Sequence, residues 1–272
     1  AECGHQLWIG DAAAIRASYV RRQKTDRRDA AHLLRLLREQ RFPRIWVPTA
    51  EERDVRQLLV HRAKRVRMAT QIKNQLQALA LNQGMRRGRK LWTAAGRQML
   101  QQLSLGPWAT RRRDELLASL EELERQIAEL DQAVKQEAGR RPQAVRLQTQ
   151  PGVGPVTALA TVLTLGPVER FASARQVASY AGLTPSEHSS GGKQRLGHIS
   201  KQGSPFLRGL LVEAAQSAAR HDPQLRRCYV RLAMRKSKGV AKVAVARKLL
   251  MKMYWMLRLG CDAAQLPGSS CR

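Results

Sequence analysis

An apolar seam between residues 111 and 138 constrains the fold more than any other feature of the chain. Its members follow one another at alternating spacings of four and three residues, which is the repeat of a coiled coil. They are Leu116, Leu120, Leu123, Ile127, Leu130 and Val134. The seam needs another helix to cover it, so the sequence predicts either an antiparallel helical hairpin within the chain or a dimer. The outer face of this helix carries the one acidic block of the chain, which we expect to avoid nucleic acid.

Residues 51 to 83 are the candidate partner helix. Thr49 and Glu52 give the helix-start pattern S/T-x-x-E, and apolar residues recur along one stripe. The stripe contains Val55, Leu59, Val66, Ile72, Leu76 and Leu79. Arginine and lysine, including Arg62 and Arg65, cover the remaining surface, while acids are scarce beyond the first turn. Pairing between neighbouring turns therefore cannot neutralise these cations, which favours a helix that faces nucleic acid.

The balance of charge indicates the class of partner. The chain of 272 residues holds 49 Lys and Arg against 21 Asp and Glu, a net charge of +28. Such a charge repels itself unless a polyanion is present, and nucleic acid is the simplest one because each neutralised phosphate releases counterions. An acidic membrane surface is the competing explanation, but the cations are spread over several segments and no run is apolar enough to span a bilayer. We therefore expect a nucleic-acid partner and no membrane.

Cysteine usage points to the cellular compartment. The four cysteines are widely scattered and form no CxxC pair. This pattern predicts neither a zinc site nor a disulfide scaffold, and it favours a reducing compartment such as the cytoplasm.

The segment of residues 186 to 204, SEHSSGGKQRLGHISKQGS, can contribute almost nothing to a core. Long polar, glycine-rich segments inside compact domains are uncommon and often functional. A serine beside paired glycines, with Lys193, Arg195 and Lys201 nearby, suits a nucleophile that attacks a phosphodiester. On this segment alone, a mobile surface loop explains the composition equally well.

Two carboxylates open a helix that is predicted over residues 24 to 40, where Thr25 or Asp26 can be the N-cap. Asp26 and Asp29 are three positions apart, so they share one face of the first turn. The pair could hold a divalent cation such as Mg²⁺. The alternative, which this segment alone favours, is a capping arrangement with Asp26 as the N-cap and Asp29 bonded back to it.

A glycine turn opens the C-terminal half. PGVG precedes an apolar helix and resembles a helix-hairpin-helix element, in which backbone N–H groups at Gly152 and Gly154 would bind a DNA phosphate. A tight turn between two helices is the alternative. Further helices are predicted over residues 205 to 223 and 226 to 258.

The segment of residues 226 to 258, which is predicted to be helical, is strongly basic. Lys238 and Lys242 belong to its cationic surface, which we expect to bind DNA or RNA. Near the N-terminus, residues 5 to 10 and 15 to 20 are predicted to be short extended segments.

Four blocks of sequence, read together, carry a resemblance. They are KTDRRDA, PGVGPVTALA, ASYAGLTPSEHSSGGKQRLGHISKQGS and the basic end helices. In order and spacing they resemble the insertion-sequence "one-ten" transposases over nearly the whole chain, and SSGGKQRLGHISKQG is highly specific. The resemblance implies a DNA transposase or recombinase of prokaryotes, guided by a structured RNA and dependent on Mg²⁺. It implies donor and target DNA as further partners, a dimer or tetramer, and a cytoplasmic, nucleoid-associated location.

The resemblance also implies the domain order of a mainly α protein. Residues 1–48 would be a partial RuvC-like domain, the remnant of an RNase H α/β fold. Residues 49–140 would be a helical coiled-coil hairpin. Residues 141–262 would be an α-helical transposase domain with the helix-hairpin-helix-like element and the catalytic serine, and residues 263–272 a tail.

The site residues are carried over by position. Ser190, directly before the paired glycines, resembles the nucleophile of the family, and Ser189 is the second choice because the doubled serine leaves the register open by one. Asp26 and Asp29 resemble the last two acids of a DEDD tetrad that binds Mg²⁺. The polar positions expected to contact nucleic acid near the scissile phosphate are Lys193, Arg195, His198 and Lys201.

The other two acids of the tetrad should lie upstream of Ala1, so we expect the chain to be N-terminally truncated. The alternative function is therefore a catalytically inactive copy that only binds DNA or RNA. A metal-dependent nuclease that uses the acids without the serine is a third hypothesis, and the incomplete tetrad argues against it.

Overall fold

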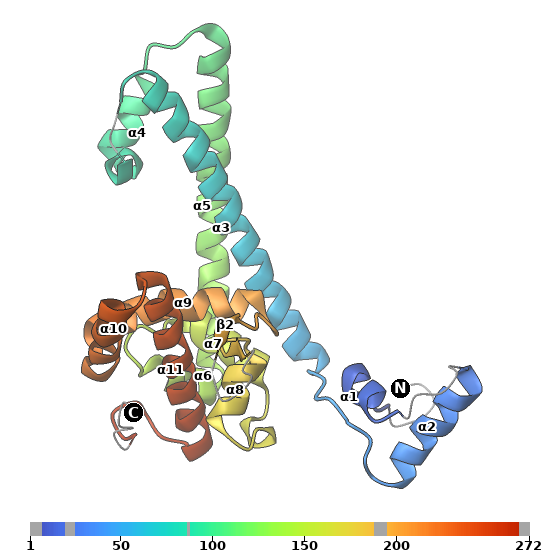
Figure 1. Ribbon diagram of the computed structural model, residues 1–272. Coiled ribbons are helices and arrows are strands. Elements are labelled where there is room, and N and C mark those ends of the chain that lie inside the picture. The colour runs from blue at the N-terminus through green and yellow to red at the C-terminus, as the bar shows by residue number, and fades with distance from the viewer. Residues whose placement is uncertain (1–6, 20–24, 86–87, 188–194, 267–272) are drawn as a thin grey trace. The chain divides into compact units, whose positions relative to one another are not determined.

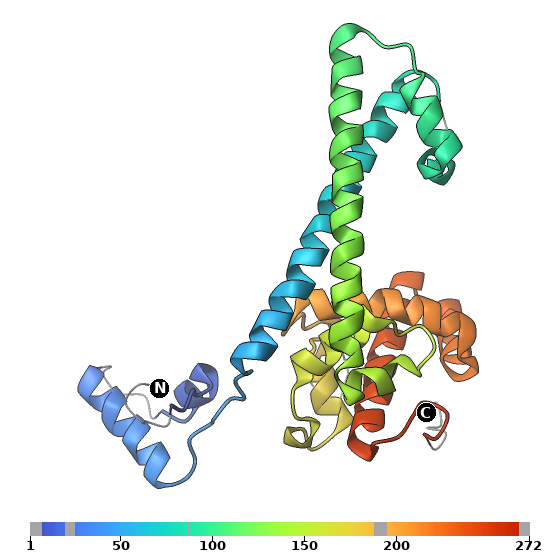
Figure 2. The same cartoon turned by 180° about the vertical axis from the view of Figure 1, so that it is seen from behind.

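The computed structural model describes residues 7–19, 25–85, 88–187 and 195–266 of the chain. The chain divides into two compact units, Ala1–Glu51 and Glu52–Arg272. Helices dominate both units, as Figures 1 and 2 show from opposite sides. The prediction of a mainly α protein is therefore confirmed.

The first helix of the N-terminal unit replaces a predicted strand. α1 (Ala12–Ala17) begins after Asp11, whose carboxylate accepts hydrogen bonds from two backbone N–H groups of the first turn at 2.8 and 3.1 Å. The extended segment predicted over residues 15 to 20 is therefore wrong for its described part, residues 15 to 19, while residue 20 lies outside the described ranges. A capped run of alanines favours a helix more strongly than the following residues favour a strand.

The β structure of this unit is slight in the residues described. Residues 5 and 6 of the strand predicted over residues 5 to 10 lie outside the described ranges, and among residues 7 to 10 only Gly10 pairs, in one antiparallel bridge with Arg44. A Cβ at Gly10 would lie 2.6 Å from the ring of Phe42, so the close approach needs glycine. The α/β character expected of an RNase H-like domain is limited here to that bridge.

α2 (Asp26–Arg38) is the helix predicted near the N-terminus. Its N-cap is Thr25, whose side chain accepts a hydrogen bond from a backbone N–H of the first turn at 3.4 Å. The buried His32 ring lies between the Ser18 hydroxyl and the Arg35 guanidinium, each 3.1 Å from one of its nitrogens. The helix therefore joins the N-terminal unit through its His32 face.

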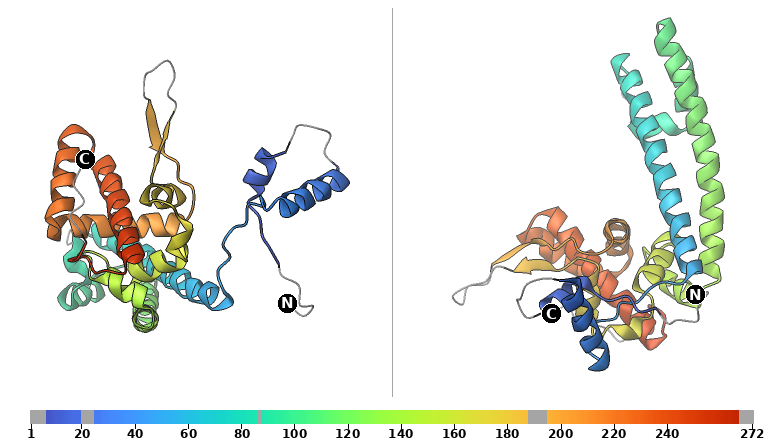
Figure 3. Two further views of the ribbon diagram at one scale, coloured as in Figure 1. Left: turned by 90° about the horizontal axis from the view of Figure 1, so that it is seen from below. Right: turned by 90° about the vertical axis from the view of Figure 1, so that its right-hand side faces the viewer.

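α3 (Ala50–Asn82) and α5 (Pro107–Gly139) form an antiparallel hairpin, which is one of the two arrangements that the apolar seam predicts. The two helices run side by side in Figures 1 and 3. Leu76 of α3 packs with Leu120 and Leu123 of α5 in one apolar cluster. The seam is therefore covered within the chain, and no second copy is needed to bury it.

Glu124 of α5 connects three helices at this hairpin. Its carboxylate accepts from Lys73 of α3 at 2.8 Å and from Arg97 of α4 (Ala94–Gln101) at 2.6 Å. Burial acts to raise the pKa of Glu124, but hydrogen bonds from the two cations outweigh it and hold the pKa below its ordinary value. The acids of α5 thus neutralise cations of α3 across the hairpin.

Replacing Glu124 by alanine is expected to destabilise the hairpin by about 1–2 kcal/mol, because two partly buried cations then lose their shared counter-charge. Urea unfolding followed by circular dichroism measures the loss. Glu129→Ala is the matched control, since Glu129 is an exposed acid of α5 that pairs with the exposed Arg125 and should matter little. Equal losses in the two variants would contradict the connecting role of Glu124.

A small second core closes the distal end of the hairpin. It contains η1 (Gly88–Trp92) and α4, neither of which the sequence predicted. Leu91 and Leu100 pack there with Ala80 of α3 and are buried.

The C-terminal domain gathers helices around one large core. Its helices are α6 (Pro142–Gln148), α7 (Pro155–Leu165), η2 (Val168–Arg170), α8 (Ala174–Tyr180), α9 (Pro205–His221), α10 (Pro223–Arg235) and α11 (Lys238–Leu259). Leu159, Leu211 and Leu249, from α7, α9 and α11, are fully buried in the core. Val55 and Leu59 of α3 join it, which fixes the base of the hairpin to the domain. None of the helices in the described residues is long and apolar enough to cross a bilayer.

The basic segment predicted to be helical over residues 226 to 258 is divided between two helices, α10 and α11. α10 ends before Lys236, which has an extended backbone with φ −139° and ψ 173°. Ser237 then caps α11, because its side chain accepts from the N–H of Val240 at 3.4 Å. A serine at this position favours a new helix start over continuation of the old helix.

Candidate functional site

A short antiparallel hairpin carries the segment with the predicted nucleophile. β1 (Pro185–Glu187) pairs with β2 (Leu196–Ile199). The Ser186 hydroxyl donates a hydrogen bond to the carbonyl oxygen of His198 at 3.1 Å, which adds a link between the strands. Figure 3 shows both strands extending away from the helices of the domain.

Ser189, Ser190 and Lys193 lie between the two strands in sequence and outside the described residues. The flanking residues are described, and Glu187 lies opposite Leu196 in the strand register. The two ends of the serine segment therefore start from one pair of facing residues.

Two glycines allow the base of the hairpin to close. Gly182 and Gly203 adopt left-handed backbone conformations, with φ of +68° and +70°. A Cβ at Gly182 would lie 2.1 Å from the carbonyl oxygen of Gln202, and a Cβ at Gly203 would lie 2.1 Å from that of Tyr180. The chain that enters the hairpin thus touches the chain that leaves it, backbone against backbone.

Arg208 of α9 fastens this base to the core. One of its guanidinium nitrogens donates to the carbonyl oxygens of Ala181 and Gly203, each at 3.3 Å, and also to that of Gln202. The guanidinium therefore bonds to chain on both sides of the hairpin. The serine segment is consequently carried by a base that is tied to a core helix.

Three residues predicted to contact nucleic acid lie on or beside the second strand. Arg195, His198 and Lys201 are all exposed. Lys201 has a φ of +56°, which is uncommon for a residue with a side chain, and its N–H donates to the carbonyl of Gly182 at 3.3 Å. Strained conformations of this kind gather at functional sites. The described part of the hairpin thus presents these three side chains to solvent.

The two predicted metal ligands lie in the first turn of α2, in the N-terminal unit. Asp26 is exposed and Asp29 is half-buried, and neither carboxylate has a hydrogen-bond or ion-pair partner among the described residues. The capping alternative needs Asp26 as the N-cap, a position that Thr25 occupies. Within the described ranges, no group of three or more His, Cys, Asp or Glu could hold a metal ion. The pair therefore offers two carboxylate groups as ligands.

The glycine turn between α6 and α7 is packed against α9. Gly152 has a φ of +87°, and a Cβ there would lie 2.5 Å from the backbone nitrogen of Ala218. Gly154 is the exposed N-cap of α7 and has open space where a Cβ would be. Close packing thus accounts for Gly152, as the tight-turn alternative supposes, whereas Gly154 leaves the N-terminus of α7 open to solvent.

The cations of α3 are less available to bind nucleic acid than the sequence suggested. Arg62 donates to Asp131 of α5 at 2.6 Å, and the Nε of Arg65 lies 3.5 Å from His61. Acids within α3 are indeed scarce, but the hairpin brings acids from α5 alongside. An acid that is distant in sequence, Asp131, therefore neutralises Arg62, which no acid in a neighbouring turn of α3 could neutralise.

The first two turns of α11 contain the exposed Lys238 and the half-buried Lys242. Sequence reasoning placed the second cationic surface here and missed a group of exposed arginines on the preceding helix. They are Arg226, Arg227, Arg231 and Arg235 of α10. The serine at position 237 was the signal that separates α10 from α11.

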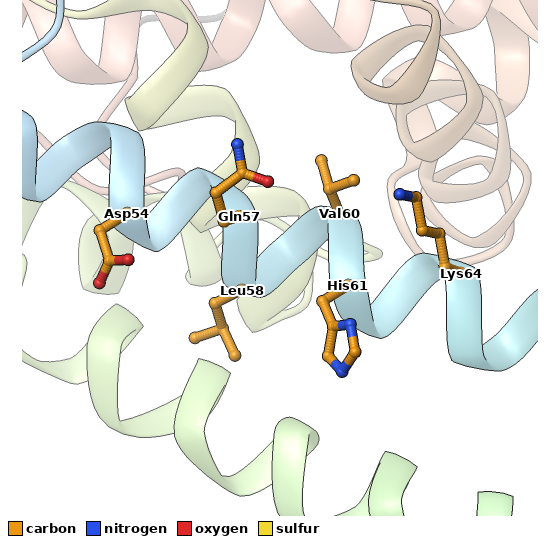
Figure 4. A pocket seen from close by; sticks show the side chains of 6 residues that line it. All are labelled: Asp54, Gln57, Leu58, Val60, His61 and Lys64. Carbon is orange, nitrogen blue, oxygen red and sulfur yellow. The ribbon is translucent and has the colours of Figure 1, made fainter.

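A hollow on α3 does not form a ligand site. The residues that line it are Asp54, Gln57, Leu58, Val60, His61 and Lys64. Figure 4 shows Leu58 and His61 leaving one side of the helix, while Val60 and Lys64 leave the other. These side chains do not converge on a common point.

Two family models match the chain. The transposase IS116/IS110/IS902 family matches residues 144–230, which include the glycine turn and the serine hairpin. A transposase model of the DEDD type from IS110 matches residues 9–84, which include the two aspartates of α2.

Curated relatives extend over most of the chain. A Pseudomonas aeruginosa protein named "Probable family 20 transposase" is 30% identical over 277 residues, covering 98% of this chain and 81% of the relative. The transposase for insertion sequence element IS1111A of Coxiella burnetii is 31% identical over 207 residues, covering 75% and 57%. The transposase for insertion sequence element IS1328 of Yersinia enterocolitica is 29% identical over 221 residues, covering 79% and 64%. The chain therefore belongs to the IS116/IS110/IS902 family of insertion-sequence transposases.

Proposed function

We propose that this transposase cuts and rejoins DNA through a serine in the segment between β1 and β2. The hydroxyl oxygen of Ser190, or of Ser189, attacks a backbone phosphorus of the DNA. A bond forms between that oxygen and phosphorus as the bond from phosphorus to one sugar oxygen breaks; the serine loses its proton and the sugar oxygen gains one. The phosphoserine keeps the energy of the phosphodiester, so rejoining by another sugar hydroxyl needs no high-energy cofactor.

The hairpin base is the observation that supports this proposal most strongly. Gly182 and Gly203 bring the two flanking chains together, and Arg208 ties them to α9. A segment with almost no core-forming residues is thus held from a rigid support, with Arg195 and Lys201 exposed beside it. Catalytic groups are commonly carried in this way on segments that a rigid scaffold positions.

Asp26 and Asp29 fit the chemistry of a Mg²⁺ ligand pair. Both carboxylates are oxygen donors without partners among the described residues, and both lie in one helical turn. Mg²⁺ keeps several of its waters and needs few protein ligands. When bound there, the ion would supply positive charge to a phosphate group. Asp26 and Asp29 would hold and orient it, and the match to a DEDD-type transposase model supports this role.

The proposed partners are donor DNA, target DNA and a structured guide RNA. The net charge of +28 leaves many cations for phosphates after the hairpin has paired some of its own. We also propose a dimer or tetramer, in which the aspartates of one copy can serve the serine of another. Such a complex would act at the nucleoid of a prokaryotic cell.

The second candidate function is a copy that binds DNA or RNA without cutting it. The exposed cations of the C-terminal helices favour binding whether or not the serine reacts. This candidate predicts salt-sensitive binding that is unaffected by loss of the serines, and no strand cleavage.

Covalent trapping tests the serine. The protein is incubated with guide RNA, donor DNA and target DNA, and denaturing electrophoresis then separates protein–DNA adducts. We expect adducts from the unaltered protein and a loss of at least about 1,000-fold in the Ser189→Ala, Ser190→Ala double variant, because the attacking oxygen is gone. Ser186→Ala is the matched control, since that hydroxyl is bonded within the hairpin and should be dispensable for the adduct.

Two outcomes would reject the proposal. Adducts that persist in the double variant would exclude both serines as nucleophiles. Absence of adducts from the unaltered protein, together with salt-sensitive DNA binding that the double variant retains, would identify the binding-only copy.

A further inference from the structure

α10 presents a face that nothing in the described part of the chain covers. Its buried side, with Leu225 and Cys228, packs toward α9 and α11, and Figure 1 shows α10 on the outer side of this group. Two rows run along the other side at a spacing of four residues. The rows are Arg227, Arg231 and Arg235, and Arg226, Val230 and Met234. The side chains of Val230 and Met234 are 48% and 82% exposed, so apolar groups lie in the open between cations.

No acid neutralises this face within the described residues. The sequence from Pro223 to Leu259 contains neither Asp nor Glu. Asp222, which precedes it, is buried and bonded to Lys252 at 2.8 Å. Glu213 of α9 accepts from its own neighbour Gln216 at 3.2 Å. The arginines of α10 therefore keep their charge for a ligand.

The cationic surface continues onto the neighbouring helices. A hollow beside α10 is lined by Arg226 and Val230 together with Arg220 of α9 and Lys242 of α11. Cations from three helices thus lie around Val230, which forms the exposed apolar centre of this face together with Met234. This arrangement differs from a solvated charged face, because long cationic side chains flank apolar ones that water does not favour.

We propose that α10 is a docking helix that lies in the major groove of duplex DNA. This inference rests on the proposed function only in taking DNA as the substrate. A helix fits the major groove of B-form DNA, which is about 12 Å wide. The row of Arg227, Arg231 and Arg235 would contact phosphates of one strand and Arg226 those of the other, while the apolar residues face the base edges, where thymine methyl groups offer apolar contact.

Two other occupants fit the face less well. The major groove of A-form RNA is too deep and narrow to admit a helix. Most exposed acids on α5 of a second copy are already paired, Glu115 with Arg111, and both Glu122 and Glu129 with Arg125. Such a surface has little charge left to offset the arginines of α10. Charge complementarity and shape thus both favour duplex DNA.

Salt-dependent binding tests the proposal. Arg227→Gln, Arg231→Gln and Arg235→Gln are combined in the full chain, and binding to a short duplex is followed by fluorescence anisotropy over a series of salt concentrations. The slope of log K against log salt should become shallower by roughly 2–3, since each lost phosphate contact removes about 0.9. The matched control has the same change in charge at arginines of α5 and of its C-cap that pair with acids, and it should keep the slope. Its substitutions are Arg111→Gln, Arg125→Gln and Arg140→Gln.

A second variant tests the apolar centre. Val230→Ser with Met234→Ser leaves the charge intact, so we expect binding several-fold weaker with an unchanged salt slope. Circular dichroism of both variants establishes that the fold is kept. An unchanged slope in the arginine variant would overturn the proposal, as would a loss of binding to a structured RNA hairpin without a loss of binding to the duplex.

The proposals for the docking helix and for the serine can be rejected independently of each other. Unaltered protein that forms no covalent adduct, while the arginine variant loses its salt slope, supports the docking helix and rejects the serine. Adducts from the unaltered protein with an unchanged slope in the variant reject the docking helix and leave the serine supported.

Discussion

Replacing Asp222 by alanine is expected to destabilise the C-terminal domain by about 3–5 kcal/mol, the range for breaking a buried ion pair. The side chain is 5% exposed, and one carboxylate oxygen accepts from Lys252 at 2.8 Å and from Gln150 at 3.1 Å. The other oxygen caps α10 by accepting from the N–H groups of Gln224 and Leu225 at 2.9 and 3.2 Å. Alanine would leave a largely buried ammonium group without its counter-charge and a helix without its cap.

Urea unfolding of the full chain, followed by circular dichroism, measures this loss. Glu213→Ala is the matched control, because Glu213 is an exposed acid of α9 whose one bonding partner among the described residues is the neighbouring Gln216. Asp222→Asn should fall between the two, since the amide oxygen can still cap α10 but carries no charge. An alanine variant as stable as the control would show that Asp222, which joins the end of α9 and the start of α10 to Lys252 of α11, does not hold these helices together.

The same carboxylate predicts a dependence on pH. Burial acts to raise the pKa of Asp222, but hydrogen bonds from Lys252, the Leu225 N–H and Gln150 outweigh it, and the pKa lies below its ordinary value. The unfolded chain therefore takes up the proton more readily than the folded one. The stabilisation is complete above the ordinary aspartate pKa of about 3.9 and is lost as the pH falls through the lower, folded-state value. Asp222→Asn should lack this part of the acid sensitivity.

Replacing Gly203 by alanine is expected to disrupt the hairpin base and to abolish adduct formation. The left-handed backbone at φ +70° costs a residue with a Cβ about 1–2 kcal/mol by itself. The new Cβ would also meet the carbonyl oxygen of Tyr180 at 2.1 Å, and no side-chain rotation relieves a contact with backbone. The base must therefore open, which displaces the serine segment from its support on Arg208.

Hydrogen exchange at the strands and the adduct assay together measure this effect. Gly209→Ala is the control, because Gly209 lies in α9 with open space at its Cβ and should gain up to about 1 kcal/mol from helix propensity. Opposite signs in two glycine-to-alanine changes only six positions apart would be difficult to explain by general sensitivity of the region. Normal adduct yield from Gly203→Ala would show that the crossing of the two chains is not needed for activity.

The sequence predicted the long hairpin because its signals are local and repeated. The seam that begins at Leu116 repeats over several turns, so its period identifies both the helix and its need for a partner. The pairing of Arg62 with Asp131 was not predictable in the same way, since it joins residues far apart in sequence. The charge pattern within α3 alone therefore overestimated how many of its cations are free to contact nucleic acid.

The short elements were harder to predict, because the residues that determine them lie beside residues that suit a different structure. Asp11 and Ser237 each start a helix, where the surrounding residues also suited a strand or an uninterrupted helix. The pairing of β1 with β2 had no clear alternation to reveal it, because the segment is polar on both sides. Gly152 has the residue type expected of a phosphate-binding turn, but its contact with α9 exists only in the folded chain.

The absence of acids between Pro223 and Leu259 has a consequence beyond recognition. Repulsion between so many like charges destabilises the folded domain, and a bound polyanion reduces this repulsion. By mass action, any ligand that prefers the folded state also prolongs it. Transposase molecules that are bound to DNA should therefore stay folded longer than unbound ones, so that the lifetime of the folded protein depends on DNA binding.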